Sequence, residues 1–389
     1  MRPGTRGPAK AAAFLLSLVI LVSLFSPGAR AAEVKRSTQA LKVNGCPVSC
    51  SAYNIDGSNY YRLRDLALLL TDTGSRFSVD YDAKARAVII VTGEAYTPIG
   101  GELEPGADLS ATAKPTTQRI FIDGQERTDL SAYNIGGGSG SNYFRLRDLG
   151  KALGFHVHYH EESHTVLLRS RFAPGEARLP ETEDAGRDYL DKIVFLGECT
   201  TYGIGYYYRH GFPDLCPPAQ IWTPRSGTMS LAYYESARIL YPGTREELSI
   251  PECASRSKPE ILIITLGVNG LSLLDESGFK AKYRALVGEL REASPATEII
   301  LNAIYPLADS WEGTGYLTNA MIDKANLWLE AMAEELGCPF LCCREALEAD
   351  GRLPEKYHNG DGLHLAGEAY SRIIAYIRTH ALASPLPQD

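Results

Sequence analysis

Two stretches in the first half of the chain alternate strictly between apolar and polar residues. They are Phe77-Ser-Val-Asp-Tyr-Asp82 and Phe155-His-Val-His-Tyr-His160, and each precedes a short apolar run, at 87–91 and at 165–168. A period of two places Phe, Val and Tyr on one face of a strand and the polar residues on the other. The pattern therefore predicts two half-buried strands, each followed by a more buried one.

These stretches belong to a longer internal repeat. Residues 52–66 read Ala-Tyr-Asn-Ile-Asp-Gly-Ser-Asn-Tyr-Tyr-Arg-Leu-Arg-Asp-Leu, and residues 132–149 read Ala-Tyr-Asn-Ile-Gly-Gly-Gly-Ser-Gly-Ser-Asn-Tyr-Phe-Arg-Leu-Arg-Asp-Leu. The Arg-Leu-Arg-Asp-Leu part has the spacing of a short amphipathic helix that covers one face of a sheet. We expect two copies of one module, each a small mixed α+β unit.

The repeated motif resembles the copper amine oxidase N-terminal-like, or stalk, domain of bacterial surface proteins. The resemblance covers residues 38–170 and rests on Ala-Tyr-Asn-Ile followed by Asn-Tyr-(Tyr/Phe)-Arg-Leu-Arg-Asp-Leu. The family's name records homology to an accessory domain, so the resemblance implies neither copper nor amine oxidation.

Histidines at 156, 158, 160 and 164 raise the question of a metal site, because imidazole is a common metal ligand. Neighbouring residues on one face of a strand lie too far apart for three of them to share one ion easily. The corresponding positions of the first repeat are Ser78, Asp80 and Asp82. We therefore interpret the histidines as a solvated strand face.

The second half of the chain has a different pattern. A linker rich in Pro, Gly and acidic residues at 171–187 leads into short apolar strands at 193–196, 261–266 and 299–304, which alternate with helical patterns. A last helix carries Tyr370, Ile373, Ile374 and Ile377 toward the core. Alternation of strands and helices predicts a parallel sheet with helices on both faces, hence an α/β domain.

The first 31 residues have the features of a secretory signal. Arg2, Arg6 and Lys10 precede an apolar run of 15 residues from Ala11 to Phe25, and Ala29-Arg30-Ala31 is a typical cleavage pattern. The run is shorter than the roughly 17 to 25 residues that span a bilayer. We expect a secreted or cell-surface protein with no stable membrane span after cleavage, an uncleaved anchor being the alternative.

The charge of the chain is acidic. Removing the signal, with its four basic residues and no acidic one, would lower the formal charge from −8 to −12. Such a charge gives no attraction to a phosphate backbone, so we expect no nucleic-acid partner.

Eight cysteines in an exported chain are compatible with disulfides, although their spacing does not fix a pairing. Cys338, Cys342 and Cys343 resemble half of a metal site. No second Cys or His cluster is spaced to complete a zinc tetrahedron.

Candidate chemistry gathers where strands of the second half end. Cys199 follows Gly197 at the turn from a strand into a helix, where the helix dipole and backbone N–H groups favour a developing oxyanion. Asn269 follows the 261–266 strand and offers a side-chain amide. Asp361 lies three residues before His364, a spacing that lets the carboxylate bind the imidazole Nδ1–H and leaves Nε2 for a nucleophile.

This order of motifs resembles the SGNH or GDSL hydrolase family across residues 189–382. The resemblance implies a three-layer αβα, flavodoxin-like parallel sheet. It places Cys199 at the nucleophile, His364 and Asp361 at the base and its orienting acid, and Cys199, Gly227 and Asn269 at the oxyanion hole. It implies no metal and no organic cofactor.

Three residues depart from the family pattern. Cys199 stands where the family has serine, Glu198 replaces the usual aspartate, and Gly270 replaces the aspartate after Asn269. A helix N-terminus and a nearby imidazole both lower the pKa of a thiol, which favours a working cysteine nucleophile. His358 is a rival base, and we expect it to face solvent. An aromatic group that could line a sugar-binding groove follows the first two motifs, core packing being the alternative: Tyr206, Tyr207, Tyr208 and Trp222.

The resemblance implies an exported enzyme that hydrolyses a carboxylic ester, with the O-acetyl ester of a glycan as the suggested substrate. The partners would be an ester-bearing carbohydrate or a small acyl ester, and a cell-wall polymer held through the repeats. The alternative is a catalytically inactive protein that binds wall polysaccharide or serves a structural role.

Overall fold

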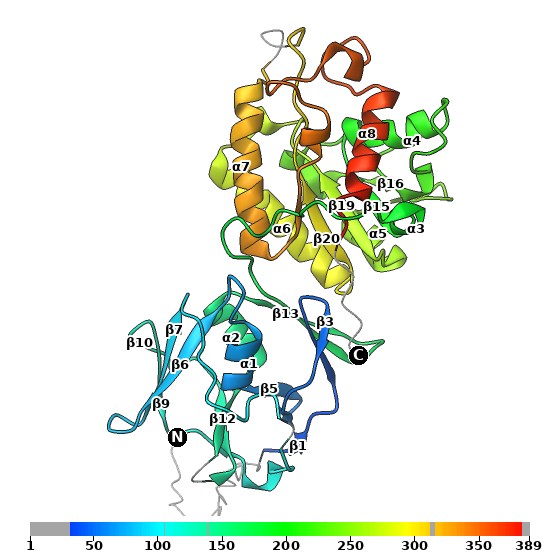
Figure 1. Ribbon diagram of the computed structural model, residues 1–389. Coiled ribbons are helices and arrows are strands. Elements are labelled where there is room, and N and C mark those ends of the chain that lie inside the picture. The colour runs from blue at the N-terminus through cyan, green and yellow to red at the C-terminus, as the bar shows by residue number, and fades with distance from the viewer. Residues whose placement is uncertain (1–31, 105, 138–139, 312–315, 383–389) are drawn as a thin grey trace, which may run out of the picture.

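The computed structural model describes residues 32–382, apart from 105, 138–139 and 312–315. The chain forms an N-terminal domain built mainly of strands and a C-terminal domain of alternating strands and helices (Figure 1). The expected signal, residues 1–31, lies outside the described residues. No helix within the described ranges is long and apolar enough to cross a membrane.

A six-stranded antiparallel sheet forms the centre of the N-terminal domain. The two similar sequence segments lie side by side in it, because β5 of the first pairs with β12 of the second. The strand order is β1 (Val34–Arg36), β4 (Ala52–Ile55), β5 (Ser58–Arg62), β12 (Ser141–Arg145), β11 (Ala132–Ile135) and β8 (Lys114–Pro115).

Each Arg-Leu-Arg-Asp-Leu motif begins a helix, as its spacing predicts. The helices are α1 (Leu63–Leu69) and α2 (Leu146–Leu153), and both follow directly on a sheet strand. In α2 the buried residues Leu146, Leu149 and Leu153 share one face. Short 3₁₀ turns complete the chain, with Ser110–Thr112 in this domain and Pro218–Gln220, Leu231–Ser236, Leu271–Leu273, Cys343–Ala346 and Glu355–Tyr357 in the next.

The two similar segments do not form two separate units, contrary to the expectation from the sequence. The hairpin of β6 (Phe77–Asp82) and β7 (Ala87–Thr92) pairs with β9 (Arg119–Ile122) and β10 (Gln125–Glu126), which precede the second segment. The hairpin of β13 (His156–His160) and β14 (Thr165–Arg169) pairs with β2 (Ala40–Val43) and β3 (Cys46–Val48), which precede the first.

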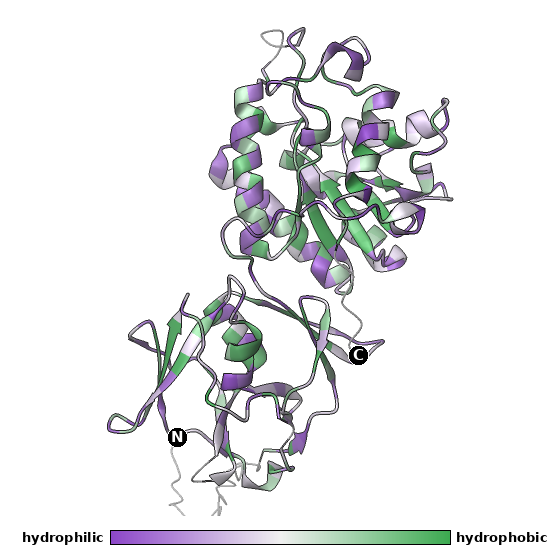
Figure 2. Cartoon of the chain, viewed as in Figure 1, coloured by the Kyte–Doolittle hydropathy of each residue, from purple (hydrophilic) through white to green (hydrophobic). Residues whose placement is uncertain are grey.

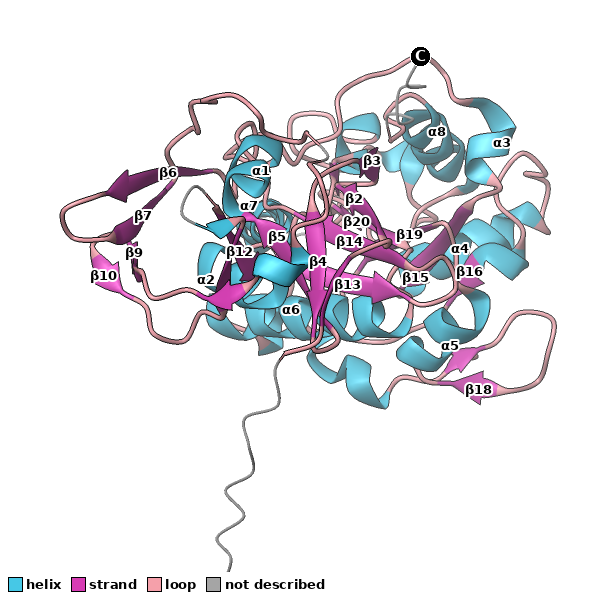
Figure 3. Cartoon of the chain, turned by 90° about the horizontal axis from the view of Figure 1, so that it is seen from below, coloured by secondary structure: helices cyan, strands magenta, loops and turns pink. Residues whose placement is uncertain are grey.

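The exchange stabilises each hairpin. An isolated two-stranded hairpin is at best marginally stable, whereas two hairpins together make a four-stranded sheet. Figure 3 shows the first of these sheets at one side of the domain, away from β13 and β14.

The C-terminal domain contains the predicted parallel sheet. Its five strands run β16 (Ile221–Trp222), β15 (Ile193–Gly197), β19 (Ile261–Thr265), β20 (Glu298–Asn302) and β21 (Phe340–Leu341). When the strands are numbered in chain order, their spatial order is 2-1-3-4-5, as in a doubly wound sheet. The direction of winding reverses between the first and third strands. A small hairpin, β17 (Ile239–Leu240) and β18 (Glu247–Leu248), lies outside the sheet.

Helices cover both faces of this sheet and enclose two apolar cores. One core contains α5 (Ile250–Ser257), α6 (Glu276–Ala293) and α7 (Asn319–Leu336), and the other contains α3 (Gly186–Leu190), α4 (Cys199–Tyr208) and α8 (Gly367–Arg378). The sheet strands between them are strongly apolar (Figure 2). Such strands, buried on both faces, explain the continuous apolar runs in the sequence.

The segment proposed as a linker packs along the C-terminal domain. Its Ala177 is buried in the core of that domain, and the Leu179 N–H donates to the Phe340 carbonyl oxygen over 2.8 Å. The domains are also joined by Arg169, which forms an ion pair with Glu298 and donates to the Thr297 carbonyl oxygen over 3.1 Å.

The histidine face of β13 is not freely solvated, contrary to the expectation. Burial, followed by the charge of Arg291 in the C-terminal domain, lowers the pKa of both His156 and His158 to about 4. Within the described residues, no group of three or more His, Cys, Asp and Glu side chains is placed to hold a metal ion. All eight cysteines are free thiols.

Candidate active site

The turn from β15 into α4 brings a thiol to the edge of the sheet. Gly197 leaves no room for a side chain, because a Cβ there would lie 2.0 Å from Thr201 Oγ1 and 2.6 Å from the Thr265 carbonyl oxygen. Cys199 is the first residue of α4, and its half-buried side chain is free. The sulfur thus lies at the carboxyl ends of β15 and β19, where the strand order reverses and open sheets bind their ligands.

Glu198, next to this cysteine, ties the loop after β19 to the start of α4. Its fully buried carboxyl group accepts the backbone N–H groups of Gly267 at 2.9 Å, Val268 at 2.6 Å and Asn269 at 2.9 Å. Burial raises the pKa of Glu198 to about 8, although the three N–H groups act in the opposite direction. Sequence reasoning missed this role, since the three N–H groups come from a distant loop.

The Asn269 side chain faces the thiol. Its Nδ2 lies 3.8 Å from Cys199 Sγ and donates to Thr228 Oγ1 over 2.8 Å. Gly270 follows with φ at +91°, and a Cβ there would lie 2.2 Å from Ser230 Oγ. This conformation favours glycine, which accounts for the missing aspartate.

The thiol of Cys199 is not activated in this structure, which corrects the expectation of a lowered pKa. Burial, and then the neighbouring Glu198, raise the pKa of Cys199 to about 11, although the Asn269 amide and the first N–H groups of α4 lower it. At neutral pH the group is therefore a protonated thiol, and it needs a base to become a nucleophile.

Asp361 and His364 form the expected pair. His364 Nδ1 lies 2.6 Å from Asp361 Oδ2, while Asp361 Oδ1 accepts the backbone N–H groups of Leu363 and His364, each at 2.8 Å. Burial alone would raise the pKa of Asp361, but the imidazole and the two N–H groups outweigh it and lower the pKa. The ionised carboxylate therefore fixes the ring through Nδ1 and directs Nε2 outward.

Helix α4 begins at Cys199, α8 begins three residues after His364, and the two helices are in contact. Tyr370, in the first turn of α8, donates its hydroxyl to the Thr200 carbonyl oxygen over 2.8 Å and packs against Gly203 of α4. Helices α4 and α8 thus lie side by side (Figure 1). In the described part of the chain, no hydrogen bond joins the thiol to the imidazole.

Gly227, the expected second oxyanion donor, already uses its N–H within a turn. That N–H donates to the Pro224 carbonyl oxygen over 2.8 Å, and φ at Gly227 is +76°. A Cβ at Gly227 would meet the Tyr202 ring at 3.0 Å, so the residue does lie beside α4. The group becomes available to an oxyanion only if the turn opens.

His358 is buried with 7 % of its surface exposed, and does not face solvent as expected. Its Nδ1 accepts the N–H groups of Gly360 and Gly362, both at 3.0 Å, and its Nε2 lies 2.9 Å from Glu355 Oε2. It therefore holds the loop that carries Asp361. Sequence spacing alone missed this role, because a turn rich in Asn, Gly and Asp is usually exposed.

A pocket of about 590 Å³ opens beside Asn269. Arg225, Thr228 and the exposed Tyr233 are among the residues that line it. Trp222, expected as a candidate groove residue, lies instead in the core with 1 % exposure, while Tyr206 stacks on His210 at the surface. The pocket therefore lies next to the candidate oxyanion donor Asn269.

Comparison with known proteins supports this chemistry. A model of the GDSL-like Lipase/Acylhydrolase family matches residues 195–372, a little under half of the chain. The matched range includes the cysteine, the Asn269 loop and the Asp361–His364 pair. No match was found among curated proteins.

Several solved structures resemble part of this chain at low identity. A GDSL-like lipase from Bacteroides thetaiotaomicron is 19% identical and covers 48% of this chain and 85% of its own, with a TM-score of 0.34. A carbohydrate esterase family 3 protein from Talaromyces cellulolyticus is 15% identical over 48% and 93%, with a TM-score of 0.33. A peptidoglycan O-acetylesterase is 14% identical over 36% and 40%, with a TM-score of 0.29.

Residues 195–372 of this chain thus match the GDSL-like Lipase/Acylhydrolase family, and this match supports an ester hydrolase.

Proposed function

We propose that the protein is an exported esterase that removes acyl groups, O-acetyl groups in particular, from a glycan by a Cys-His-Asp variant of the SGNH mechanism. The flavodoxin-like order of the C-terminal sheet is the arrangement expected of such an enzyme. The observation that carries the proposal is a thiol at the first residue of α4, 3.8 Å from the Asn269 amide. Residues 1–31 would direct the protein to the cell surface or the medium.

The first half of the reaction forms a thioester. As Cys199 Sγ attacks the carbonyl carbon, its proton passes to His364 Nε2, and Asp361 stabilises the resulting imidazolium. Asn269 Nδ2 and the Cys199 N–H stabilise the oxyanion, and the Gly227 N–H joins them when its turn opens. The C–O bond then breaks, and the imidazolium proton goes to the leaving alcohol oxygen.

Water completes the cycle. His364 takes a proton from a water molecule, which attacks the thioester carbonyl. Collapse of the second oxyanion then breaks the C–S bond, the imidazolium proton passes to the Cys199 sulfur, and the carboxylic acid leaves. The imidazole must come within hydrogen-bond distance of the sulfur when substrate is bound, as catalytic hydrogen bonds often tighten only in the substrate complex.

The second candidate function is binding without turnover. It is favoured by the raised thiol pKa of about 11 and by the lack of a Cys199–His364 hydrogen bond among the described residues. In that case the domain would recognise an esterified polymer and leave the ester intact.

Hydrolysis of p-nitrophenyl acetate separates the two functions. We expect Cys199→Ala and His364→Ala to lower kcat/KM by at least about 100-fold, the usual contribution of a general base. Cys46→Ala is the matched control, because Cys46 is an exposed thiol of the N-terminal domain. An acetyl adduct on Cys199, detected by mass spectrometry in quenched wild type, would identify the thioester.

Equal rates for wild type and both alanine variants would overturn the proposal. An inactive wild type together with an active Cys199→Ser variant would establish the binding function instead.

A further inference from the structure

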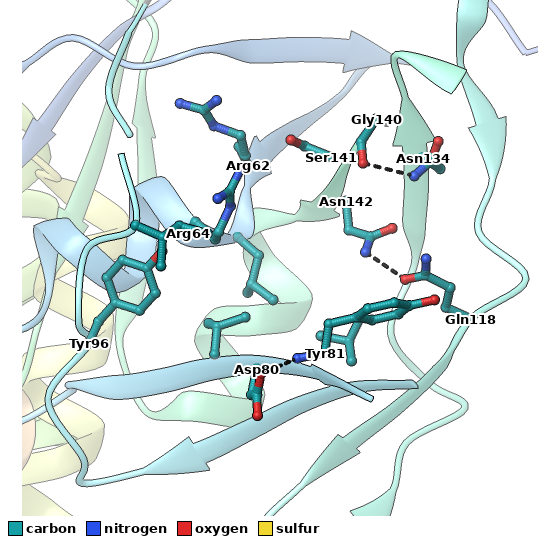
Figure 4. Close-up of a pocket in the computed structure, with 14 residues that line it drawn as sticks. Arg62, Arg64, Asp80, Tyr81, Tyr96, Gln118, Asn134, Gly140, Ser141 and Asn142 are labelled. Carbon is teal, nitrogen blue, oxygen red and sulfur yellow. Dashed lines mark hydrogen bonds between the residues drawn. The ribbon is translucent and has the colours of Figure 1, made fainter. Parts of the chain in front are cut away.

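The N-terminal domain contains two pockets, of about 430 and 200 Å³, that the ester hydrolase chemistry does not use. Each is built from both similar segments because of the strand exchange. The larger lies between the start of α1, the β6–β7 hairpin and β12, and the smaller lies between the start of α2, the β13–β14 hairpin and β5. Figure 4 shows the larger pocket.

The two pockets present corresponding side chains. Both pockets include a tyrosine from the adjoining hairpin, a glutamine and an asparagine at corresponding positions of the two similar segments. The pairs are Tyr81 with Tyr159, Gln118 with Gln39, and Asn142 with Asn59. The polar positions of the same strands differ, with Asp80 lining the larger pocket where His158 lines the smaller one.

The amide pairs have the same geometry in both pockets. Asn142 Nδ2 donates to Gln118 Oε1 over 2.7 Å, and Asn59 Nδ2 donates to Gln39 Oε1 over 2.6 Å. Each bond fixes the glutamine amide and leaves its Nε2 group for a further acceptor, since no hydrogen bond to either Nε2 occurs within the described residues. The pockets therefore present oriented donors, held in place before any ligand binds.

An aromatic ring faces the amides in the larger pocket. Tyr81 is 47 % exposed and lies below Asn142 and Gln118, with its ring turned toward the open space (Figure 4). Val79, on the same side of β6, extends this apolar wall. An exposed aromatic ring opposite fixed polar groups is the arrangement of a ligand site with one flat apolar side and one hydrogen-bonding edge.

Three of the four arginines that line the pockets are paired with carboxylates. Arg62 pairs with Asp65 at 2.6 Å, Arg64 with Glu102 at 3.8 Å and Arg145 with Asp148 at 2.8 Å, while Arg147 in the smaller pocket is exposed. A phosphate or sulfate would have to compete with these carboxylates. The pockets are better suited to an uncharged group that has several hydroxyls and an aliphatic face.

We propose that each pocket binds one saccharide unit of a polysaccharide. The C–H face of the sugar ring would lie against Tyr81 or Tyr159, and its hydroxyls would accept from and donate to the Gln–Asn pair. Two such sites on one domain would hold the protein on a polymer by avidity, because the second unit binds at a high effective concentration. The proposal concerns binding alone and does not depend on ester hydrolysis at Cys199.

The test starts with the full chain from residue 32 on a glycan array, followed by calorimetric titration with a soluble oligosaccharide of the glycan that binds. We expect two sites per chain in wild type, one site in Tyr81→Ala and in Tyr159→Ala, and none in the double variant. Retention on the insoluble polymer should fall at least about tenfold in each single variant, as expected for loss of one of two linked sites.

Tyr316→Ala is the matched control, since Tyr316 is 74 % exposed in the C-terminal domain. Gln118→Ala and Gln39→Ala repeat the test without removing a ring, and near-ultraviolet circular dichroism confirms that each variant is folded. The proposal is overturned if no glycan on the array binds, if a peptide binds in place of a glycan, or if the double variant keeps the wild-type stoichiometry.

Discussion

Replacing Glu198 by glutamine tests the electrostatics of the candidate site. The carboxyl group is fully buried, and burial raises its pKa from 4.5 to about 8. Below pH 4.5 the folded and the unfolded chain both carry the proton. Between 4.5 and about 8 only the folded chain keeps it, so the contribution of this group to stability is present at low pH and is lost as the pH rises through the folded pKa.

The magnitude follows from the size of the shift. Each pKa unit corresponds to about 1.36 kcal/mol, so the free energy of unfolding should fall by roughly 4 to 5 kcal/mol over this window. Glutamine has the same length but no charge to titrate. The stability of wild type relative to Glu198→Gln should therefore decline by that amount from about pH 5 to about pH 8.

Tryptophan fluorescence during urea unfolding measures this difference. All three tryptophans, Trp222, Trp311 and Trp328, belong to the C-terminal domain, so the signal follows the domain that contains Glu198. Glu292→Gln, an exposed change in α6, is the matched control. Parallel pH profiles for wild type and Glu198→Gln would refute the reasoning. A gain in the stability of wild type relative to Glu198→Gln as the pH rises to about 4.5 would mean that the three backbone N–H groups hold the carboxylate ionised.

Three further predictions concern the same site. Asn269→Ala should lower kcat for p-nitrophenyl acetate by about 100- to 1,000-fold, as loss of one oxyanion donor does, and an unchanged kcat would exclude the amide from that role. Because the pKa of Cys199 is about 11, iodoacetamide should modify Cys199 more slowly than the exposed Cys46 at neutral pH, and the rate at Cys199 should increase as the pH rises. Peptide mapping that finds Cys199 labelled before Cys46 at neutral pH would contradict this prediction. Gly197→Ala should destabilise the C-terminal domain by about 1 to 3 kcal/mol, because its Cβ would overlap a backbone carbonyl, and an unchanged urea midpoint would show that the turn can move.

Local patterns in the sequence determined the elements of this fold. Alternation at 77–82 and 155–160 predicted the strands β6 and β13, and the apolar runs at 193–196 and 261–266 predicted buried parallel strands. These predictions hold because a strand buried on one face alternates between apolar and polar residues, and a strand buried on both faces is continuously apolar. Short sequence spacing predicted the Asp361–His364 pair, because residues three apart in a tight turn lie close together.

Contacts between distant segments decided the rest. Which hairpin pairs with β2 or β9 depends on free strand edges in another part of the chain, so the exchange in the N-terminal domain has no local signal. The pKa of Cys199, the Glu198 contacts with 267–269, and the turn that engages the Gly227 N–H depend on packing between α4, the loop after β19 and the 224–228 turn. Desolvation and hydrogen bonding act over a few ångströms in space, and only the folded chain brings these groups that close.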